Sequence, residues 1–161
     1  MVPASTRIRL DGCNQLLTRI CGKPMRFGAW LAGLGFDPTQ RGCIRHDHLP
    51  SLLESFNEIL QELTTGWNDP RVVLILQRHL GLDGLRPETL PQLGEQMGVS
   101  RERIRQLEAK PIRRLSSRKL QRLLEDRVRT TVIELVGPPS SSLPPNTLVN
   151  ARSDRHAAQP K

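Results

Sequence analysis

The residues with the clearest chemical capacity form one polar run, from Arg101 to Lys110. If the run is helical, steps of about 100° per residue place a polar face opposite Ile104 and Leu107. That face consists of Arg101, Glu102, Arg105, Gln106 and Ala109, flanked by Arg103 and Lys110. Arginine and glutamine side chains read guanine and adenine edges, glutamate can accept a hydrogen bond from cytosine, and flanking basic residues suit phosphates. The run predicts a helix that reads DNA; the alternative is a solvated basic helix of a small bundle.

A turn and a second helix are predicted directly before this helix. Helical spacing places Leu93 and Met97 on one face of the preceding helix. Gly98 can adopt the positive φ that a tight turn between helices requires. Thr89 and Ser100 are suitable N-caps for the two helices. Gly94 is small where the helices are expected to cross, and Val99 is an apolar residue in the turn. Residues 89–115 are therefore predicted to form a helix-turn-helix.

The same residues carry a family resemblance. The stretch GLDGLRPETLPQLGEQMGVSRERIRQLEAKPIRRL resembles region four, the C-terminal promoter-binding domain of primary-type bacterial sigma factors. The resemblance covers about Asp69 to Leu124 and implies recognition of a promoter minus-35 element in double-stranded DNA. It also implies docking on the flap of the RNA polymerase β subunit. By residue matching, the base-facing residues are Arg101, Glu102 and Gln106, and those near phosphates or the DNA backbone are Arg103, Arg105, Lys110, Thr89 and Leu90.

Two prolines depart from the family pattern. Pro91 falls early in the first helix, where a missing N–H is tolerable. Pro111 stands where the family usually carries alanine inside a continuing helix. It removes the hydrogen bond to the Leu107 carbonyl and is expected to kink or break the helix there.

Charge is concentrated in and after the second motif helix. The 161-residue chain has a net charge of +8, and residues 101–129 alone carry 11 basic and 4 acidic residues. This is the electrostatic footprint of a protein that binds a polyanion. A membrane surface is the competing polyanion, but the basic stretch has no aromatic-rich apolar face. The chain also has no apolar run of membrane-span length and no secretion signal, and its three cysteines fit a reducing compartment. We therefore expect a cytoplasmic protein of the bacterial nucleoid.

The periodicity predicts an all-α fold, a small helical bundle containing the helix-turn-helix. Expected helices cover residues 13–20, 27–34, 50–63 and 70–80, with another after Pro111 reaching about residue 135. Residues 1–10 are expected to fray, residues 35–42 to form a loop, and the proline- and serine-rich residues 137–161 to be disordered. The predicted domains are a helical extension over 1–68, a region-four-like domain over 69–136 and the tail.

Other sites are less well supported. Cys43, His46 and His48 lie close together, with Cys13 and Cys21 upstream, but their spacing fits no standard zinc pattern. A Cys–His nucleophile pair has no third, orienting group. We expect no enzyme, no cofactor, no bound metal and no small-molecule substrate. The five aromatic residues are scattered along the sequence and predict no platform for stacking unpaired bases.

Three classes of function remain open. The first is a sigma-like transcription regulator that binds promoter DNA, together with RNA polymerase. The second is an interaction protein that occupies the polymerase flap or binds a sigma or anti-sigma partner, with incidental DNA contact. The third is a DNA-bound accessory of recombination or defence. The basic face favours the first, whereas the apolar helix Val72–Leu80 supports the second.

Overall fold

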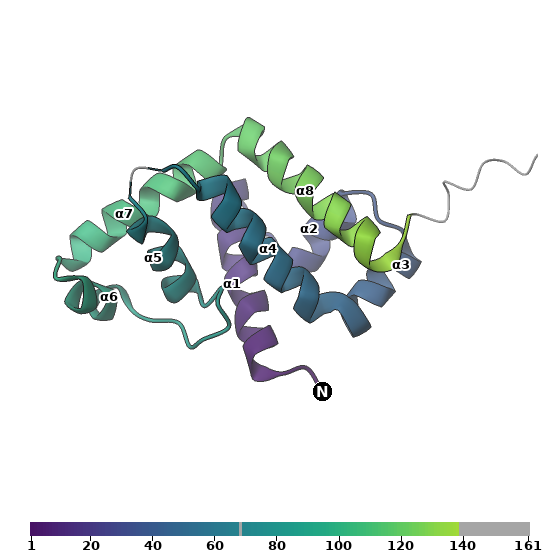
Figure 1. The fold of residues 1–161 in the computed structure, drawn as a ribbon, viewed down its shortest axis with the longest axis horizontal. Helices are drawn as coiled ribbons and strands as arrows, with labels where there is room; N and C mark the ends of the chain where they lie inside the picture. Colours follow the sequence, from purple (N-terminus) through teal and green to yellow (C-terminus); the bar gives the residue numbers. More distant parts are fainter. Residues whose placement is uncertain (68, 139–161) are drawn as a thin grey trace, which may run out of the picture.

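The computed structural model describes residues 1–67 and 69–138, and helices are its only regular secondary structure in these ranges (Figure 1). The all-α prediction is confirmed. In chain order the elements are α1 (Ala4–Cys21), α2 (Phe27–Gly33), α3 (Pro38–Cys43), a π-helical segment (Ile44–His48), α4 (Leu49–Thr64), α5 (Arg71–Leu80), α6 (Leu90–Met97), α7 (Arg101–Leu115) and α8 (Arg118–Val136). Residues 139–161, which carry nearly all of the predicted disordered tail, lie outside the described part.

The larger of two apolar clusters lies where α1, α2, α4 and α8 pack together (Figure 1). At its centre Phe27, Trp30 and Phe56 bring their rings together, with centroids 5.5 to 6.0 Å apart. Phe27 and Trp30 lie three positions apart on α2, and the fold brings Phe56 of α4 against them. All three are buried, so they stabilise the core and offer no surface on which a base could stack.

A smaller cluster joins α5, α6 and α7 and consists of Val72, Ile75, Leu93, Ile104 and Leu107. Helices α5 and α7 also reach the larger cluster, through Leu76 and Leu80 on α5 and Leu115 on α7. Helix α8 contributes Leu124, Val128 and Val132 to the larger cluster only. Residues before position 69 therefore share one core with α8, while the predicted domain boundary at 68/69 stays a prediction.

The N-terminus is more ordered than the sequence suggested. The prediction that residues 1–10 fray is wrong, because α1 begins at Ala4. Its early residues have tertiary partners: Arg9 donates from Nη2 to the Asp83 carbonyl oxygen, 3.2 Å away. Gly12 allows α1 to cross the end of α5 closely, since a Cβ there would lie 2.3 Å from the Leu80 carbonyl oxygen. The helix extends to Ala4 because the body of the protein supports it.

The prediction of a loop over residues 35–42 is also wrong, because α3 begins at Pro38. Asp37 and Gln40 form a capping box: the Asp37 carboxylate accepts from the Gln40 N–H, and the Gln40 side chain accepts from the Asp37 N–H. Proline in the first helical position suits this start. The polar, proline-containing composition that is typical of loops is here a helix start.

Pro111 does not break α7, which runs without interruption from Arg101 to Leu115. The proline is buried, and the helix is held on both sides of it by tertiary contacts. Ile104 and Leu107 lie in the smaller cluster before it, and Leu115 lies in the larger cluster after it. Packing at both ends therefore outweighs the loss of one backbone hydrogen bond.

Candidate nucleic-acid interface

The helix-turn-helix is set by local signals at each of its corners. Thr89 caps α6 in a capping box with Gln92, and Ser100 caps α7 by accepting a hydrogen bond from the Arg103 N–H at 3.2 Å. Between the helices Gly98 adopts φ 66° and ψ 31°, the left-handed conformation that favours glycine. The caps and the turn are those expected from the sequence.

The two helices cross at Gly94. A Cβ at this position would lie 2.7 Å from the Val99 carbonyl oxygen, so a side chain here would push against the turn itself. Below the crossing Leu93 and Ile104 have no exposed surface, and Leu107 is nearly as buried. This packing fixes which side of α7 faces outward.

The outward side of α7 is the polar face predicted from helical spacing. All of its members are exposed, as are the flanking basic residues: Arg101, Glu102, Arg103, Arg105, Gln106, Ala109 and Lys110. At the start of α6, Thr89 is exposed and Leu90 is half-buried. A hollow of about 400 Å³ separates this helix start from α7, and Thr89, Leu90 and Arg101 are among the residues that line it. The structure thus brings every proposed DNA-contacting residue onto α7 or the adjoining start of α6.

Side chains on this face bind one another. The Arg105 guanidinium donates to both Glu102 carboxylate oxygens, at 2.9 and 2.7 Å. The hydrogen bond from Arg105 and its positive charge hold the pKa of Glu102 below its ordinary value. Gln106 donates weakly to the same carboxylate and accepts from Arg103, each at 3.5 Å. Glu102 therefore orients Arg105 along the face and lowers the positive charge at its centre.

Glu108, a buried residue of α7 beside the polar face, was missed by the sequence reasoning. Its carboxylate is buried and contacts Arg19 Nη1 at 2.9 Å and His79 Nδ1 at 2.5 Å. Burial, the largest single influence, acts to raise the pKa of Glu108, but the hydrogen bonds and charges of His79 and Arg19 outweigh it and leave the pKa below its ordinary value. One carboxylate thus joins α1, α5 and α7 behind the polar face.

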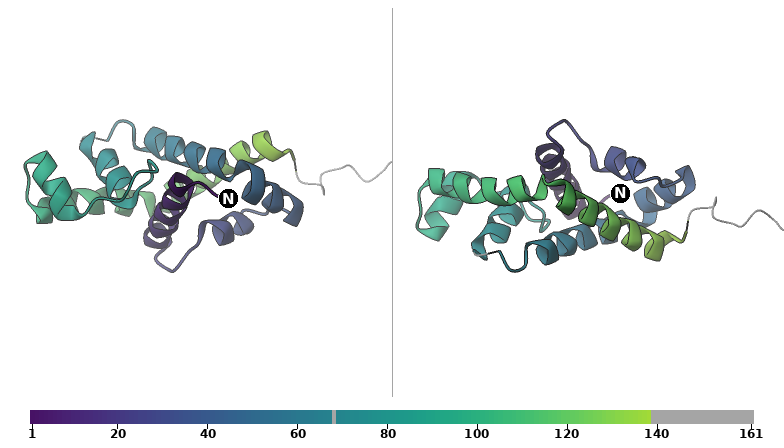
Figure 2. Two further views of the ribbon diagram at one scale, coloured as in Figure 1. Left: turned by 90° about the horizontal axis from the view of Figure 1, so that it is seen from below. Right: turned by 90° about the horizontal axis from the view of Figure 1, so that it is seen from above.

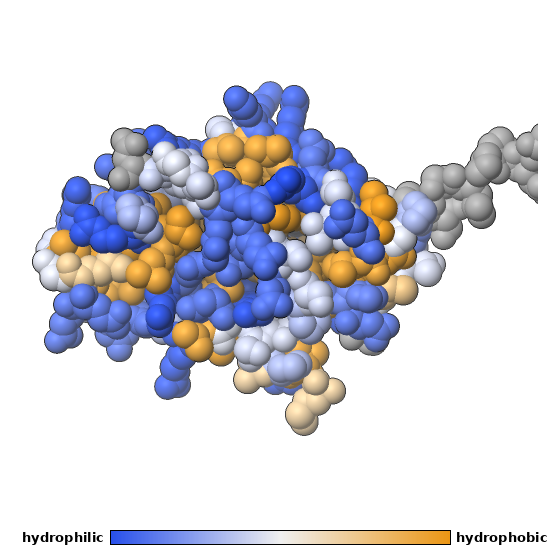
Figure 3. All heavy atoms as spheres, viewed as in Figure 1, coloured by the Kyte–Doolittle hydropathy of each residue, from blue (hydrophilic) through white to orange (hydrophobic). Residues whose placement is uncertain are grey.

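Exposed basic residues continue from the end of α7 into α8. They are Arg113, Arg114, Arg118, Lys119, Arg122 and Arg127. Helices α7 and α8 meet at Ser116 and Ser117 at the upper edge of Figure 1, and both lie in front when the molecule is seen from above (Figure 2, right). Hydrophilic side chains project from this edge in the space-filling view (Figure 3). The charge that the sequence concentrates after residue 101 therefore lies along two adjoining helices.

Comparison with known proteins agrees with this geometry. The family described as sigma-70, region 4, matches residues 69–117, which span α5, α6, α7 and the connections between them. Residues 69–117 are a sigma-70 region 4 domain. This domain is a non-enzymatic DNA-binding helix-turn-helix of sigma factors. The matched residues include all five buried members of the smaller apolar cluster, which come from α5, α6 and α7.

Relatives of the region 4 domain are primary sigma factors. RNA polymerase sigma factor RpoD of Neisseria gonorrhoeae is 45% identical over 65 residues, which are 40% of this chain and 9% of that protein. RNA polymerase sigma factor SigA of Clostridium acetobutylicum is 40% identical over 75 residues, 47% of this chain and 18% of that protein. The chain thus matches less than a fifth of either relative. No solved structure is significantly similar to the chain.

Two properties of the described residues bear on other kinds of site. None of the helices there has the length and hydropathy needed to span a bilayer. Within the same residues, no three histidine, cysteine or acidic side chains lie together as metal ligands would. Cys13 is buried in α1, where burial raises the pKa of its thiol well above the ordinary value, whereas Cys43 is exposed.

Proposed function

We propose that this chain is a sigma-like transcription regulator that binds a promoter minus-35-type element through α7, together with RNA polymerase. In this proposal Arg101, Glu102 and Gln106 face bases. Phosphate contacts come from Arg103, Arg105 and Lys110, and the DNA backbone passes the start of α6 at Thr89 and Leu90. The observation that carries the proposal is the fully exposed polar face of α7 above a buried Ile104 and Leu107. A helix supported in this way can enter a major groove without loss of its packing.

The region 4 relatives support the transcription role, since each is named an RNA polymerase sigma factor. The chain's contact with polymerase, including the flap of the β subunit, is part of the proposal. So is its location in the bacterial cytoplasm at the nucleoid. The basic residues that continue along α8 add attraction for DNA of any sequence, which speeds the search for a site.

The test begins with selection of bound duplexes from a random library, followed by anisotropy titrations on the selected site. Affinity for that site should exceed affinity for random duplex by roughly a thousandfold or more. Arg101→Ala and Gln106→Ala should each cost about 1–3 kcal/mol of discrimination while the fold is retained. Lys110→Ala should reduce the slope of the logarithm of the binding constant against the logarithm of the salt concentration by about one unit, on every duplex. Arg7→Ala, at an exposed position of α1, is the matched control.

Equal loss on all sequences for Arg101→Ala and Gln106→Ala would assign both residues to phosphate contact. Selection of no preferred duplex would refute sequence-specific binding altogether.

A second function has one observation in its favour. Leu74 on α5 is 42% exposed, although Val72, Ile75, Leu76 and Leu80 of the same helix are buried. An exposed leucine beside a half-buried Val73 suits a protein partner, such as the polymerase flap or a sigma or anti-sigma factor. Leu74→Glu should abolish polymerase pull-down and spare DNA binding, whereas the triple alanine variant of Arg101, Arg105 and Gln106 should do the reverse. If the triple variant still regulates its promoter in a reporter strain, the interaction role replaces the DNA-reading role.

A further inference from the structure

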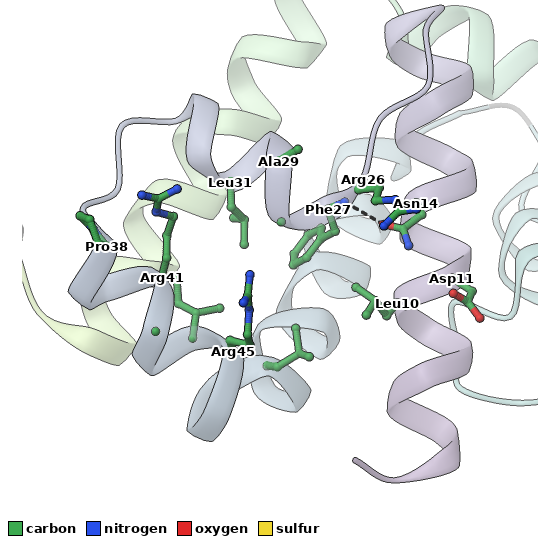
Figure 4. A pocket seen from close by; sticks show the side chains of 14 residues that line it. Leu10, Asp11, Asn14, Arg26, Phe27, Ala29, Leu31, Pro38, Arg41 and Arg45 are labelled. Atoms are coloured by element: carbon green, nitrogen blue, oxygen red, sulfur yellow. Dashed lines mark hydrogen bonds between the residues drawn. The ribbon is translucent and has the colours of Figure 1, made fainter. Parts of the chain in front are cut away.

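A groove of about 820 Å³ lies outside the region 4 domain, between α1 and α2 on one side and α3 and the π-helical segment on the other (Figure 4). Its apolar lining includes Leu10, Leu31 and Leu49. The α2 wall is fixed to α1 by a hydrogen bond from the Phe27 N–H to the Asn14 side chain, 2.7 Å long. The groove is therefore a built feature of the N-terminal half.

Three arginines surround this apolar lining. Arg45 rises from the π-helical segment toward Leu31, Arg41 stands beside it, and Arg26 lies across the groove near Asn14 (Figure 4). All three are exposed, and in the described part of the chain no carboxylate lies within ion-pairing distance of them. The lining includes one acidic residue, Asp11. The groove thus combines an apolar floor with an excess of positive charge that the fold does not neutralise.

The helix geometry on one wall is unusual. Residues Ile44–His48 form a π-helical turn between α3 and α4. Such turns are rare and frequently occur at functional sites. Here Ile44 is buried in the larger core while the next residue, Arg45, extends into the groove. The π-helical turn therefore anchors the wall and presents a guanidinium at the same point.

We propose that this groove binds an acidic, amphipathic peptide segment of a partner protein. Apolar side chains of the segment enter between α1 and α3, and its carboxylates pair with Arg26, Arg41 and Arg45. Guanidinium groups bind carboxylates through paired, charge-assisted hydrogen bonds, which gives the site both affinity and orientation. Because the groove lies outside residues 69–117, this partner can bind without displacing DNA from α7.

The lining disfavours other anionic ligands. Phe27, the aromatic residue in the groove, is 1% exposed and packs on Trp30 and Phe56, so its ring cannot stack on a nucleotide base. The first turn of α3 is already capped by Asp37, which uses an N–H that could otherwise hold a phosphate. Large exposed apolar residues of the described chain lie elsewhere, so the groove does not present a surface that inserts into a membrane.

The test is selection from a displayed library of random 12-residue peptides against the full chain. A selected peptide is then synthesised and measured by fluorescence anisotropy. We expect enrichment of peptides that combine aspartate or glutamate with large apolar residues. Arg41→Glu/Arg45→Glu should weaken binding at least tenfold, and Arg41→Gln/Arg45→Gln should weaken it by a smaller factor. The control is Arg71→Glu/Arg86→Glu, which makes the same charge change at exposed positions outside the groove and should bind as wild type.

Circular dichroism establishes that each variant is folded, and the glutamine pair provides the test if the glutamate pair does not fold. The proposal is overturned if no peptide is enriched, if enriched peptides lack acidic residues, or if the control variant loses binding equally. It is also overturned if phosphatidylglycerol vesicles or inorganic pyrophosphate, rather than peptides, bind in an Arg41- and Arg45-dependent way. A dimer in light scattering that the groove variant dissociates would assign the groove to a second copy of the chain.

Discussion

Replacement of Glu108 by glutamine tests whether the buried carboxylate holds α7 in place. The substitution keeps the size of the side chain but removes the charge that faces Arg19 and His79. A hydrogen bond that involves a charged group contributes about 1.5–3 kcal/mol. The Arg19 side chain is 36% exposed, so water screens its attraction to Glu108. The two interactions of Glu108, with Arg19 and with His79, therefore contribute less than twice the value of one charged hydrogen bond. We expect Glu108→Gln to lower the free energy of unfolding by about 1.5–3 kcal/mol at pH 7.

Urea unfolding followed by circular dichroism measures this loss. With a slope of about 1.5 kcal/mol per molar urea, the midpoint should fall by about 1–2 M. Glu58→Gln, on the exposed face of α4, is the matched control and should leave the midpoint unchanged. If Glu108→Gln unfolds at the wild-type urea concentration, the ion pairs contribute no net stability and α7 is held by apolar packing alone.

The pH dependence separates charge from shape. The pKa of Glu108 is lowered in the folded protein, so its contribution is fully present above the unfolded value of about 4.3. It is lost as the pH falls through the lower folded pKa, because the protonated carboxyl then resembles glutamine. The stability gap between wild type and Glu108→Gln should therefore narrow as the pH falls below the unfolded pKa and through the lower folded pKa. A gap that did not narrow on acidification would show that shape, and not charge, caused the loss.

Three other substitutions test the motif. Gly94→Ala should lower the free energy of unfolding by about 1–3 kcal/mol in urea titrations, because its methyl group would press on the Val99 carbonyl. Gly98→Ala is the comparison: it meets no atom within 4 Å and should cost only the roughly 1–2 kcal/mol of a left-handed residue. Glu102→Ala removes a negative charge and frees Arg105, so it should raise the affinity for random duplex. The ratio of the affinity for the selected site to the affinity for random duplex should therefore fall in anisotropy titrations. If the ratio of the two affinities is unchanged, Glu102 does not face a base.

The helix-turn-helix could be predicted from the sequence because its determinants are local. Two caps, one left-handed glycine and one small residue at the crossing all lie within residues 89–100. The start of α3 was equally local, but its capping box was overlooked in favour of composition. A proline after an aspartate is typical of loops and of helix starts alike, and the glutamine two residues after the proline is what distinguishes them here.

Features that depend on distant partners could not be predicted. Gly12 carries no sequence signal for its approach to Leu80, 68 positions away. In the sequence, Glu108 is one of several polar residues of a basic helix, and its role follows only from the fold, which places Arg19 of α1 against it. Of the groove arginines, Arg26 precedes α2, whereas Arg41 and Arg45 lie on α3 and the adjoining π-helical segment, and they border one groove only when these elements pack against α1. The roles assigned to Arg101, Glu102 and Gln106 stay predictions, which the duplex titrations test.

The two clusters also bear on whether the motif can fold without the N-terminal half. Removal of residues 1–68 would expose seven apolar residues that pack in the larger cluster: Leu76, Leu80, Leu82, Leu115, Leu124, Val128 and Val132. Burial of one such side chain contributes about 1.5–3 kcal/mol, so seven contribute up to roughly 10–21 kcal/mol. Domains of this size have a total stability of only about 5–15 kcal/mol.

We therefore expect a fragment of residues 69–138 to lose the cooperative thermal transition that the full chain shows in circular dichroism. Its amide resonances should also lose their dispersion. Glu108 would be left beside His79 without Arg19, which removes one of its two partners as well. A fragment that melted cooperatively near the temperature of the full chain would show that the smaller cluster suffices. In that case residues 1–68 would be an attachment to an independent DNA-binding domain. If the fragment fails to fold, the N-terminal half holds α7 in the orientation that DNA binding requires. A partner bound in the groove of the N-terminal half would then act on the part of the protein that supports α7.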